Sequence, residues 1–420
     1  MKIRFTYIFL FSLISLLLGC KGQNSETQEK TAEQILGNPD YLAFSYGAYR
    51  EKTREVVPTI DELKEDMRIL QAMGVKIVRT YNTQQFSQAS DLLKAIQQLK
   101  SEQADFEMYV MLGAWIDCEG AWTGSVNHDK GSIENNSAEI SAAVELANTY
   151  PEIVKIIAVG NEAMVHWASS YYVKPKIILN WVEHLQNLKK TQELPEHIWI
   201  TSSDNFASWG GASEYQGEDL TALIKAVDYI SLHTYPFHDT HYNPAFWHVP
   251  EDEAGLSHIE KAEAAMLRAK DHAISQYQLA AGYVLQVDPG KAIHIGETGW
   301  ASNAGSLYGA NGSGAADEYK AKLYYTHMRD WTNETGMSCF YFEAFDEQWK
   351  DTNDSLGSEN HFGMINLNGE AKYALWKLLD AGAFKGLTRN GKTISKSFGG
   401  DESALLTAMQ NNAMIKNSKE

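Results

Sequence analysis

Short apolar runs alternate with amphipathic stretches along the chain from about residue 41. The first apolar run, 41–46, is followed by a stretch that begins Thr59-Ile60-Asp61-Glu62 and keeps its apolar residues on one helical face as far as Gly74. A Thr with a Glu three residues later is typical of a capping box at a helix start, and Gly commonly stops a helix. The pattern therefore predicts a strand followed by a helix.

The same alternation continues to about residue 380. Further strands are predicted at 75–81, 106–115, 154–160, 198–202, 229–233, 292–296 and 339–342, and further helices at 90–100, 138–148, 175–190, 220–226, 258–280, 317–331 and 372–379. Strands that alternate with helices form parallel sheets. Eight units in one pass favour an α/β fold with a single (β/α)8 TIM barrel, whose active site lies at the C-terminal ends of the strands; an open α/β sheet is the alternative.

The two ends of the chain depart from this alternation. Lys2 and Arg4 precede an apolar run that is too short to span a bilayer comfortably and ends in Leu17-Leu18-Gly19-Cys20. This end resembles a bacterial lipobox, so we expect 1–19 to be a lipoprotein signal peptide and Cys20 to carry lipid, with an ordinary signal peptide as the alternative. The expected location is the cell envelope: the outer membrane, surface or periplasmic face. We expect 20–36 to be a flexible tether, 37–382 the catalytic domain, and 383–420 a partly disordered C-terminal extension.

Acidic residues outnumber basic ones, 54 to 36, which gives a formal net charge of −18. Such a surface repels phosphate backbones, so we expect no nucleic acid partner, whereas a neutral substrate such as a glucan is compatible. No G-x-G-x-x-G follows the first strand and no P-loop occurs, so nucleotide chemistry has no support. The 11 Trp and 21 Tyr offer flat rings that either fill cores or stack on sugars.

Two carboxylates stand directly after apolar strand runs, where a barrel of this kind holds its catalytic groups. Glu162 follows the fourth run and Glu297 the seventh, so both face one barrel mouth. Glycoside hydrolysis needs such a pair, because one carboxyl protonates the leaving oxygen while the other attacks the anomeric carbon. The pair predicts a glycosidase; a structural ion pair is the alternative for either residue.

Ordered motifs accompany this pair at the strand ends. They are Val78-Arg79-Thr80-Tyr81, Val159-Gly160-Asn161-Glu162, Tyr235-Pro236-Phe237, Ile295-Gly296-Glu297-Thr298-Gly299-Trp300, Phe342-Glu343-Ala344-Phe345-Asp346-Glu347, Lys350 and Glu359-Asn360-His361-Phe362-Gly363. The set resembles glycoside hydrolase family 17, the β-1,3-glucanases or laminarinases, over about residues 41–380. One departure is Ala301, where family members usually have Pro.

The resemblance implies a role for each matching residue. Glu162 is the implied acid/base and Glu297 the implied nucleophile, with Arg79 and Tyr235 keeping Glu297 ionised, and Asn161 hydrogen-bonding the 2-hydroxyl of the sugar under attack. The remaining residues expected to bind substrate are Tyr81, Trp115, Asp204, Trp300, Glu343, Glu347, Trp349 and Lys350. Core packing stays open for Trp115, a loop cap for Asp204, and salt bridges to Lys350 for Glu343 and Glu347.

The resemblance thus implies a retaining hydrolase that cleaves β-1,3-glucosidic bonds in laminarin-like glucans by endo action. An exo-acting β-1,3-glucosidase and a β-1,3-glucanosyltransferase stay open, because the sequence does not give the loop positions. A non-catalytic surface glucan-binding protein is the alternative of another class, which the presence of both glutamates disfavours. We expect no cofactor or metal, since the retaining mechanism needs none and His238, His241 and His248 match no zinc spacing. The expected partners of this monomer are β-1,3-glucan polysaccharide and oligosaccharides and, through Cys20, a membrane.

Overall fold

The computed structural model describes residues 30–84 and 87–411. The chain divides after Lys30, and the compact unit discussed here begins at Thr31. The predicted signal peptide and Cys20 lie outside the described residues. Among the described helices, none combines the length and apolar character that a membrane span requires.

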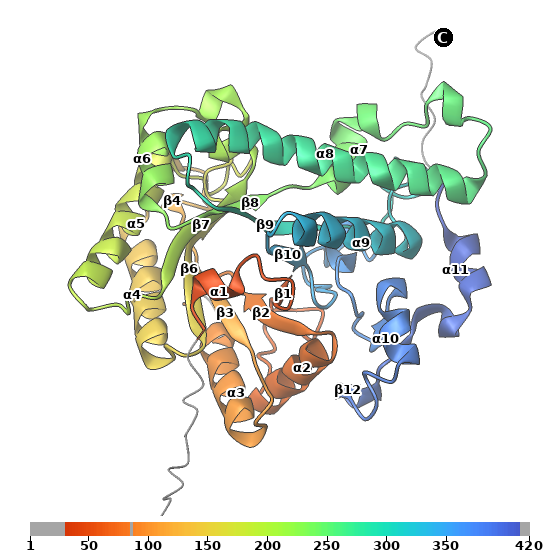
Figure 1. Ribbon diagram of the computed structural model, residues 1–420, viewed down its shortest axis with the longest axis horizontal. Coiled ribbons are helices and arrows are strands. Elements are labelled where there is room, and N and C mark those ends of the chain that lie inside the picture. The colour runs from red at the N-terminus through yellow and green to blue at the C-terminus, as the bar shows by residue number, and fades with distance from the viewer. Residues whose placement is uncertain (1–29, 85–86, 412–420) are drawn as a thin grey trace, which may run out of the picture. The chain divides into compact units, whose positions relative to one another are not determined.

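Eight parallel strands close into a barrel (Figure 1). They are β1 (Leu42–Ser45), β2 (Val75–Arg79), β3 (Tyr109–Ala114), β6 (Val154–Asn161), β7 (Trp199–Asn205), β8 (Ile230–His233), β9 (Ile293–Gly299) and β10 (Cys339–Phe342). β1 pairs with both β2 and β10 and so closes the ring. The predicted single (β/α)8 barrel is confirmed.

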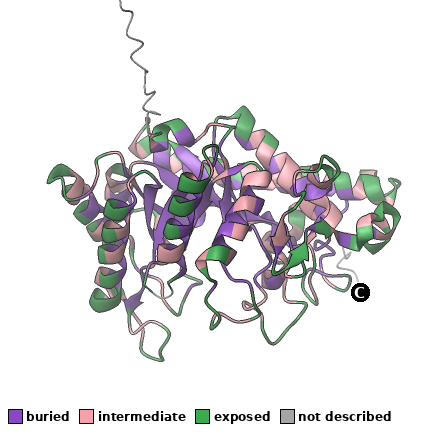
Figure 2. Cartoon of the chain, turned by 90° about the horizontal axis from the view of Figure 1, so that it is seen from below, coloured by how far each residue is buried: buried purple, intermediate pink, exposed green. Residues whose placement is uncertain are grey.

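Helices surround the strands and expose their outer faces (Figure 2). They are α2 (Ile60–Ala72), α3 (Gln88–Glu102), α4 (Ile133–Thr149), α5 (Pro175–Lys190), α6 (Glu218–Ala226), α8 (His258–Val287), α9 (Glu318–Glu334) and α10 (Trp376–Asp380). The predicted capping box is present, because the Thr59 side chain accepts from the Glu62 amide while the Glu62 side chain accepts from the Thr59 amide. Two elements that the sequence pattern did not predict follow strand ends: a hairpin of β4 (Cys118–Glu119) and β5 (Asn127–Gly131), and α7 (Pro236–Tyr242).

The barrel interior changes from apolar to polar along the strands. Ile77 and Tyr229 belong to an apolar cluster of buried residues. Two positions further along the same strands stand Arg79 and Ser231, both buried. Because alternate residues of a strand share a face, these polar side chains continue the inward row toward the C-terminal ends. The fold therefore fills one half of the barrel with core and the other half with the candidate site.

The C-terminal part of the predicted tether, 20–36, is a helix and not a tether. Helix α1 (Ala32–Ile35) has its own capping box between Thr31 and Gln34. Ala32 and Ile35 are fully buried in the apolar cluster that contains Ile77. Burial of these two apolar side chains explains why this stretch is helical rather than part of a tether.

Residues 383–411 pack on the barrel within the same compact unit. Arg389, which is fully buried, donates from Nε to Asp66 Oδ1 of α2 at 2.8 Å and from Nη2 to the Tyr49 carbonyl at 3.2 Å. Helix α11 (Glu402–Ala408) contacts α9. The expected boundary between 382 and 383 thus falls inside one packed unit, and the expected disorder does not apply to 383–411.

Candidate active site

Glu297 lies near the C-terminal end of β9 and is held by three donors. Arg79 Nη1 pairs with Oε2, and Tyr81 donates its hydroxyl to the same oxygen at 3.1 Å. Tyr235 donates to Oε1 at 2.7 Å. Arg79 reaches a second predicted site residue, because its Nη2 donates to Asn161 Oδ1. The structure therefore brings five predicted residues from four barrel walls into one hydrogen-bonded group.

These contacts set the charge of Glu297. Burial alone would raise its pKa, but the charges of His233 and Arg79 and the hydrogen bonds from Tyr235 and Arg79 act in the opposite direction. The net result is a pKa lowered from the ordinary value for glutamate. Glu297 is therefore held as a carboxylate, the form that a nucleophile needs.

Glu162 follows β6 directly and has a different environment. Its backbone is in the left-handed region at φ 45°, after Gly160 at φ 82°, and its amide donates to the Ser203 carbonyl at 2.9 Å. The side chain is 23% exposed, compared with 9% for Glu297. Its Oε1 contacts His233 Nδ1 at 3.1 Å instead of an arginine. A positive φ is costly for a residue other than Gly, and such backbone strain is concentrated at functional sites.

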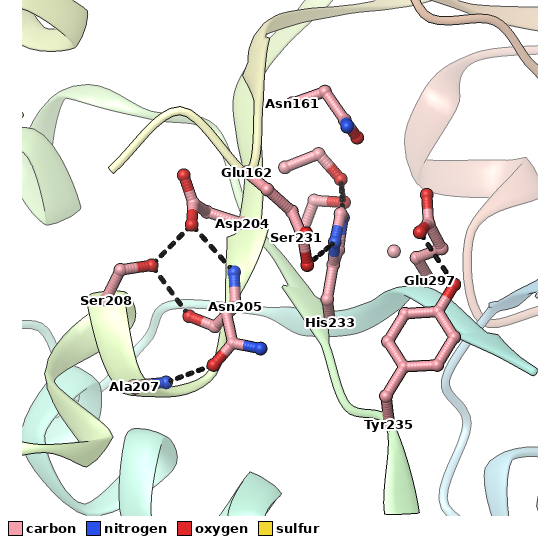
Figure 3. A network of polar contacts seen from close by, with 12 residues as sticks. Asn161, Glu162, Asp204, Asn205, Ala207, Ser208, Ser231, His233, Tyr235 and Glu297 are labelled. Atoms are coloured by element: carbon pink, nitrogen blue, oxygen red, sulfur yellow. Dashed lines mark hydrogen bonds and ion pairs between the residues drawn. The ribbon is translucent and has the colours of Figure 1, made fainter. Parts of the chain in front are cut away.

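A buried polar chain stands behind Glu162 (Figure 3). His233 Nε2 lies 2.7 Å from Ser203 Oγ, which lies 2.8 Å from Ser231 Oγ. All three side chains are fully buried. None of the three is among the site residues predicted from the sequence, although polar residues at the inward positions of apolar strands are a usable signal.

A second ion cluster follows β10. Lys350 Nζ lies 2.9 Å from Glu343 Oε2 and 3.2 Å from Glu347 Oε2, and Trp349 Nε1 donates to the same Glu347 oxygen at 3.2 Å. Burial raises the pKa of Glu343 well above its ordinary value, and the neighbouring Glu347 charge adds to this effect. The salt-bridge interpretation of these residues is thus observed, and sugar binding by the same cluster stays a prediction.

A family model for the BtgE/BtgC glycoside hydrolase domain matches residues 43–363. The chain belongs to this glycoside hydrolase family. The resemblance drawn from the strand-end motifs is confirmed.

Individual relatives of this hydrolase agree with the family match. The crystal structure of an endo-laminarinase from Formosa Hel1_33_131 is 56% identical, covers 93% of this chain and 100% of its own, and superposes with a TM-score of 0.91. A glucan 1,3-beta-glucosidase of Arthroderma benhamiae is 26% identical over 74% of this chain and 83% of the relative. A probable glucan endo-1,3-beta-glucosidase, btgC, of Aspergillus fumigatus is 25% identical over 70% of this chain, but the match spans only 36% of that longer relative.

Two residues predicted to bind substrate in this hydrolase lie in its interior. Trp300 is 1% exposed, donates from Nε1 to the Ala315 carbonyl at 2.8 Å and packs on Trp247 and Tyr324. Because both ring faces are covered by protein, the prediction that Trp300 stacks on a sugar is wrong. The sequence could not show this, since tryptophan serves cores and sugar sites alike.

Asp204 is the second correction. It is fully buried, and its carboxylate accepts from the Met164 amide at 2.8 Å, the Asn205 amide at 2.8 Å and the Ser208 hydroxyl at 2.6 Å (Figure 3). Burial first, and the charge of Glu162 to a lesser extent, raise its pKa to about 6. The loop-cap interpretation left open by the sequence is the one that the structure favours, because the cap orders the loop directly after Glu162.

Trp115 and Trp349 are half-buried, so each keeps part of its ring accessible. Trp115 lies 5.1 Å from the ring of Tyr171, and Trp349 lies under the Arg54 guanidinium at 4.4 Å. Their sugar contacts stay predictions. Among the described residues, no group of three or more His, Cys, Asp or Glu is arranged to hold a metal ion.

Proposed function

We propose that this chain is a retaining, endo-acting β-1,3-glucanase, with Glu162 as acid/base and Glu297 as nucleophile. The contrast between the two carboxylates carries the proposal. Glu297 is buried against Arg79 and two tyrosine hydroxyls, which favour its anion. Glu162 is more exposed and contacts an imidazole instead of an arginine, which leaves it accessible to the leaving group and to water.

The double displacement assigns each proton and bond. Glu297 attacks the anomeric carbon, the glycosidic C–O bond breaks, and Glu162 gives its proton to the departing oxygen. Esterification removes the negative charge of Glu297, after which Glu162 accepts a proton from water as that water attacks the same carbon. The bond to Glu297 then breaks and restores its carboxylate. Oε1 of Glu297 accepts one hydrogen bond against two at Oε2, which favours Oε1 as the attacking oxygen.

The linkage and the endo action rest on the endo-laminarinase that is 56% identical over 93% of this chain. The test is release of reducing ends from laminarin, with products followed over time. Glu297→Gln and Glu162→Gln should each lower the rate by at least about 10³-fold. Glu107→Gln is a matched control, because Glu107 pairs with Tyr41 and Lys76 before β3, at the other end of the barrel. Normal hydrolysis by Glu297→Gln would refute the assignment.

The products separate the alternatives. Mixed oligosaccharides at early times indicate endo action, glucose alone indicates exo action, and products longer than the substrate indicate glucanosyl transfer. A wild-type protein that binds laminarin and releases no reducing ends would be the non-catalytic binding protein instead.

We further propose that the enzyme is a monomer attached to the cell envelope by lipid on Cys20. The support is the sequence alone: the basic residues Lys2 and Arg4, the short apolar run and the small residue Gly19 before the cysteine. Mass spectrometry of the mature protein tests the modification, and light scattering tests the monomer. Cys20→Ala should move the enzyme from the membrane fraction to the soluble fraction, and unchanged fractionation refutes the anchor.

A further inference from the structure

A ladder of three aromatic rings spans two loops at the C-terminal end of the barrel, the end at which the catalytic pair lies. Trp115 follows β3, Tyr171 lies between β6 and α5, and Trp122 lies between β4 and β5. The ring centroids of Trp115 and Tyr171 are 5.1 Å apart, and those of Tyr171 and Trp122 are 5.0 Å apart with their planes 26° from parallel. The Trp122 amide donates to the Ser170 carbonyl at 2.8 Å, which joins the hairpin to the neighbouring loop.

The middle ring of the ladder, Tyr171, interacts electrostatically with the catalytic carboxylates. Burial raises the pKa of the Tyr171 hydroxyl, and the negative charges of Glu162, Asp204 and Glu297 raise it further. Such charge effects fall off with distance and with water between the groups. Tyr171 also lies on the loop that begins with Glu162, between the end of β6 at Asn161 and the start of α5 at Pro175, so chain position places it beside the catalytic end of the barrel.

The outer end of the ladder is an exposed tryptophan in a costly backbone conformation. Trp122 is 63% exposed and has a φ of 64°, in the left-handed region that residues with a Cβ rarely adopt. The ring stacks on Tyr171, yet most of the residue stays exposed to solvent. Fixing the hairpin to its neighbour requires only the ring face that stacks on Tyr171. A largely exposed indole held in a strained loop points to a ligand.

We propose that Trp122, supported by Tyr171, is an outer binding position for glucosyl residues of a β-linked glucan, beyond the sugars held at the catalytic pair. This inference rests on the proposed glucanase function. The ligand class follows from the surface, since an uncharged flat ring matches the C–H face of a glucopyranose and the supporting Tyr171 lies on the loop that begins with Glu162. Such a position adds affinity only for chains long enough to reach it, which suits an enzyme that cuts within polysaccharide.

The sharpest variant is Trp122→Gly. Glycine adopts a φ of 64° without a Cβ penalty, so the hairpin keeps its conformation while the ring is removed. Phe398→Gly is the matched control, because Phe398 is also exposed, at 41%, and also has a left-handed φ, of 52°. Phe398 lies in the 383–411 segment and outside the ladder. Trp122→Tyr retains a flat ring and should rescue the loss.

The measurement is kcat/KM on laminarin and on laminaritriose. Trp122→Gly should lower kcat/KM on laminarin about tenfold, equivalent to about 1.4 kcal/mol, with less than about a twofold change on laminaritriose. The melting temperature of Trp122→Gly should match that of the wild type, and so should the kcat/KM values of Phe398→Gly on both substrates. An equal loss on both substrates, or no loss on laminarin, overturns the outer position.

Affinity separates this inference from the proposed hydrolysis. In the Glu297→Gln background, Trp122→Gly should weaken laminarin binding by the same factor of about ten. If the wild type binds laminarin through Trp122 and never releases reducing ends, the outer position stands and the hydrolase assignment fails. If the wild type cuts laminarin and Trp122→Gly binds it normally, the outer position fails alone. A wild type that neither binds nor cuts laminarin overturns both.

Discussion

Removal of the Tyr235 hydroxyl should shift the pH dependence of the enzyme toward higher pH. The hydroxyl donates to Glu297 Oε1 at 2.7 Å and helps lower the pKa of that carboxyl. A hydrogen bond to a charged group contributes about 1.5–3 kcal/mol, and one pKa unit corresponds to about 1.4 kcal/mol. Tyr235→Phe should therefore raise the pKa of Glu297 by about 1 to 2 units. The nucleophile must be ionised, so the acid limb of kcat/KM should move up in pH by the same amount.

The assay is kcat/KM on laminarin from about pH 3 to pH 8, with thermal unfolding at each pH to exclude loss of fold. Tyr81→Phe removes a longer bond, 3.1 Å, to the oxygen that Arg79 also holds, so its shift should be smaller. Tyr41→Phe removes the same kind of bond, 2.9 Å to Glu107, at the other end of the barrel and should shift nothing. An acid limb that stays in place in Tyr235→Phe, with the fold intact, would refute the role of Tyr235 in holding the anion.

Three further predictions concern stability. Burial lowers the pKa of His294 from 6.5 to about 4, so the folded protein binds this proton only at a lower pH than the unfolded chain does. The free energy of unfolding should therefore fall by up to about 3 kcal/mol between pH 6.5 and pH 4. In His294→Gln, the free energy of unfolding measured in urea should depend less on pH over this range. Arg389→Ala leaves the buried carboxylate of Asp66 without its main partner and should lower the free energy of unfolding by about 3–5 kcal/mol, and a loss below 1 kcal/mol would contradict the buried ion pair. Trp300→Phe leaves the Ala315 carbonyl without its donor and should cost about 1–3 kcal/mol of stability with KM unchanged, whereas a raised KM at full stability would return Trp300 to the substrate site.

Apolar periodicity predicted the barrel because every strand and covering helix carries its own local signal. The capping box at Thr59 and Glu62 is one such signal, and it forms as predicted. The pattern failed where tertiary contacts decide. Helix α1 has only two buried apolar residues, and the position of Arg389 is fixed by Asp66, more than 300 residues earlier in the chain.

The candidate site was predictable to the extent that each residue follows a strand. Glu162, Glu297, Arg79 and Tyr235 converge because the carboxyl ends of parallel strands meet at one barrel mouth. Trp300 follows a strand as well, yet its ring turns into the core, and nothing in the sequence records the direction of a ring. Trp122 was not predicted as a site residue, because it lies on a short hairpin and does not directly follow a strand of the barrel. Its stacking partner, Tyr171, comes from another loop.

His233 connects the two carboxylates through the register of the barrel. It pairs with Glu297 across β8 and β9, and its Nδ1 lies 3.1 Å from Glu162 Oε1. With a proton on Nδ1, the imidazole donates to Oε1 whichever way the hydrogen bond between Nε2 and Ser203 Oγ runs. Oε1 is then occupied in both the acid and the carboxylate form of Glu162, which leaves Oε2 to exchange the catalytic proton. Ser203, Ser231 and His233 are polar residues at inward positions of otherwise apolar strands, and together they orient the acid Glu162.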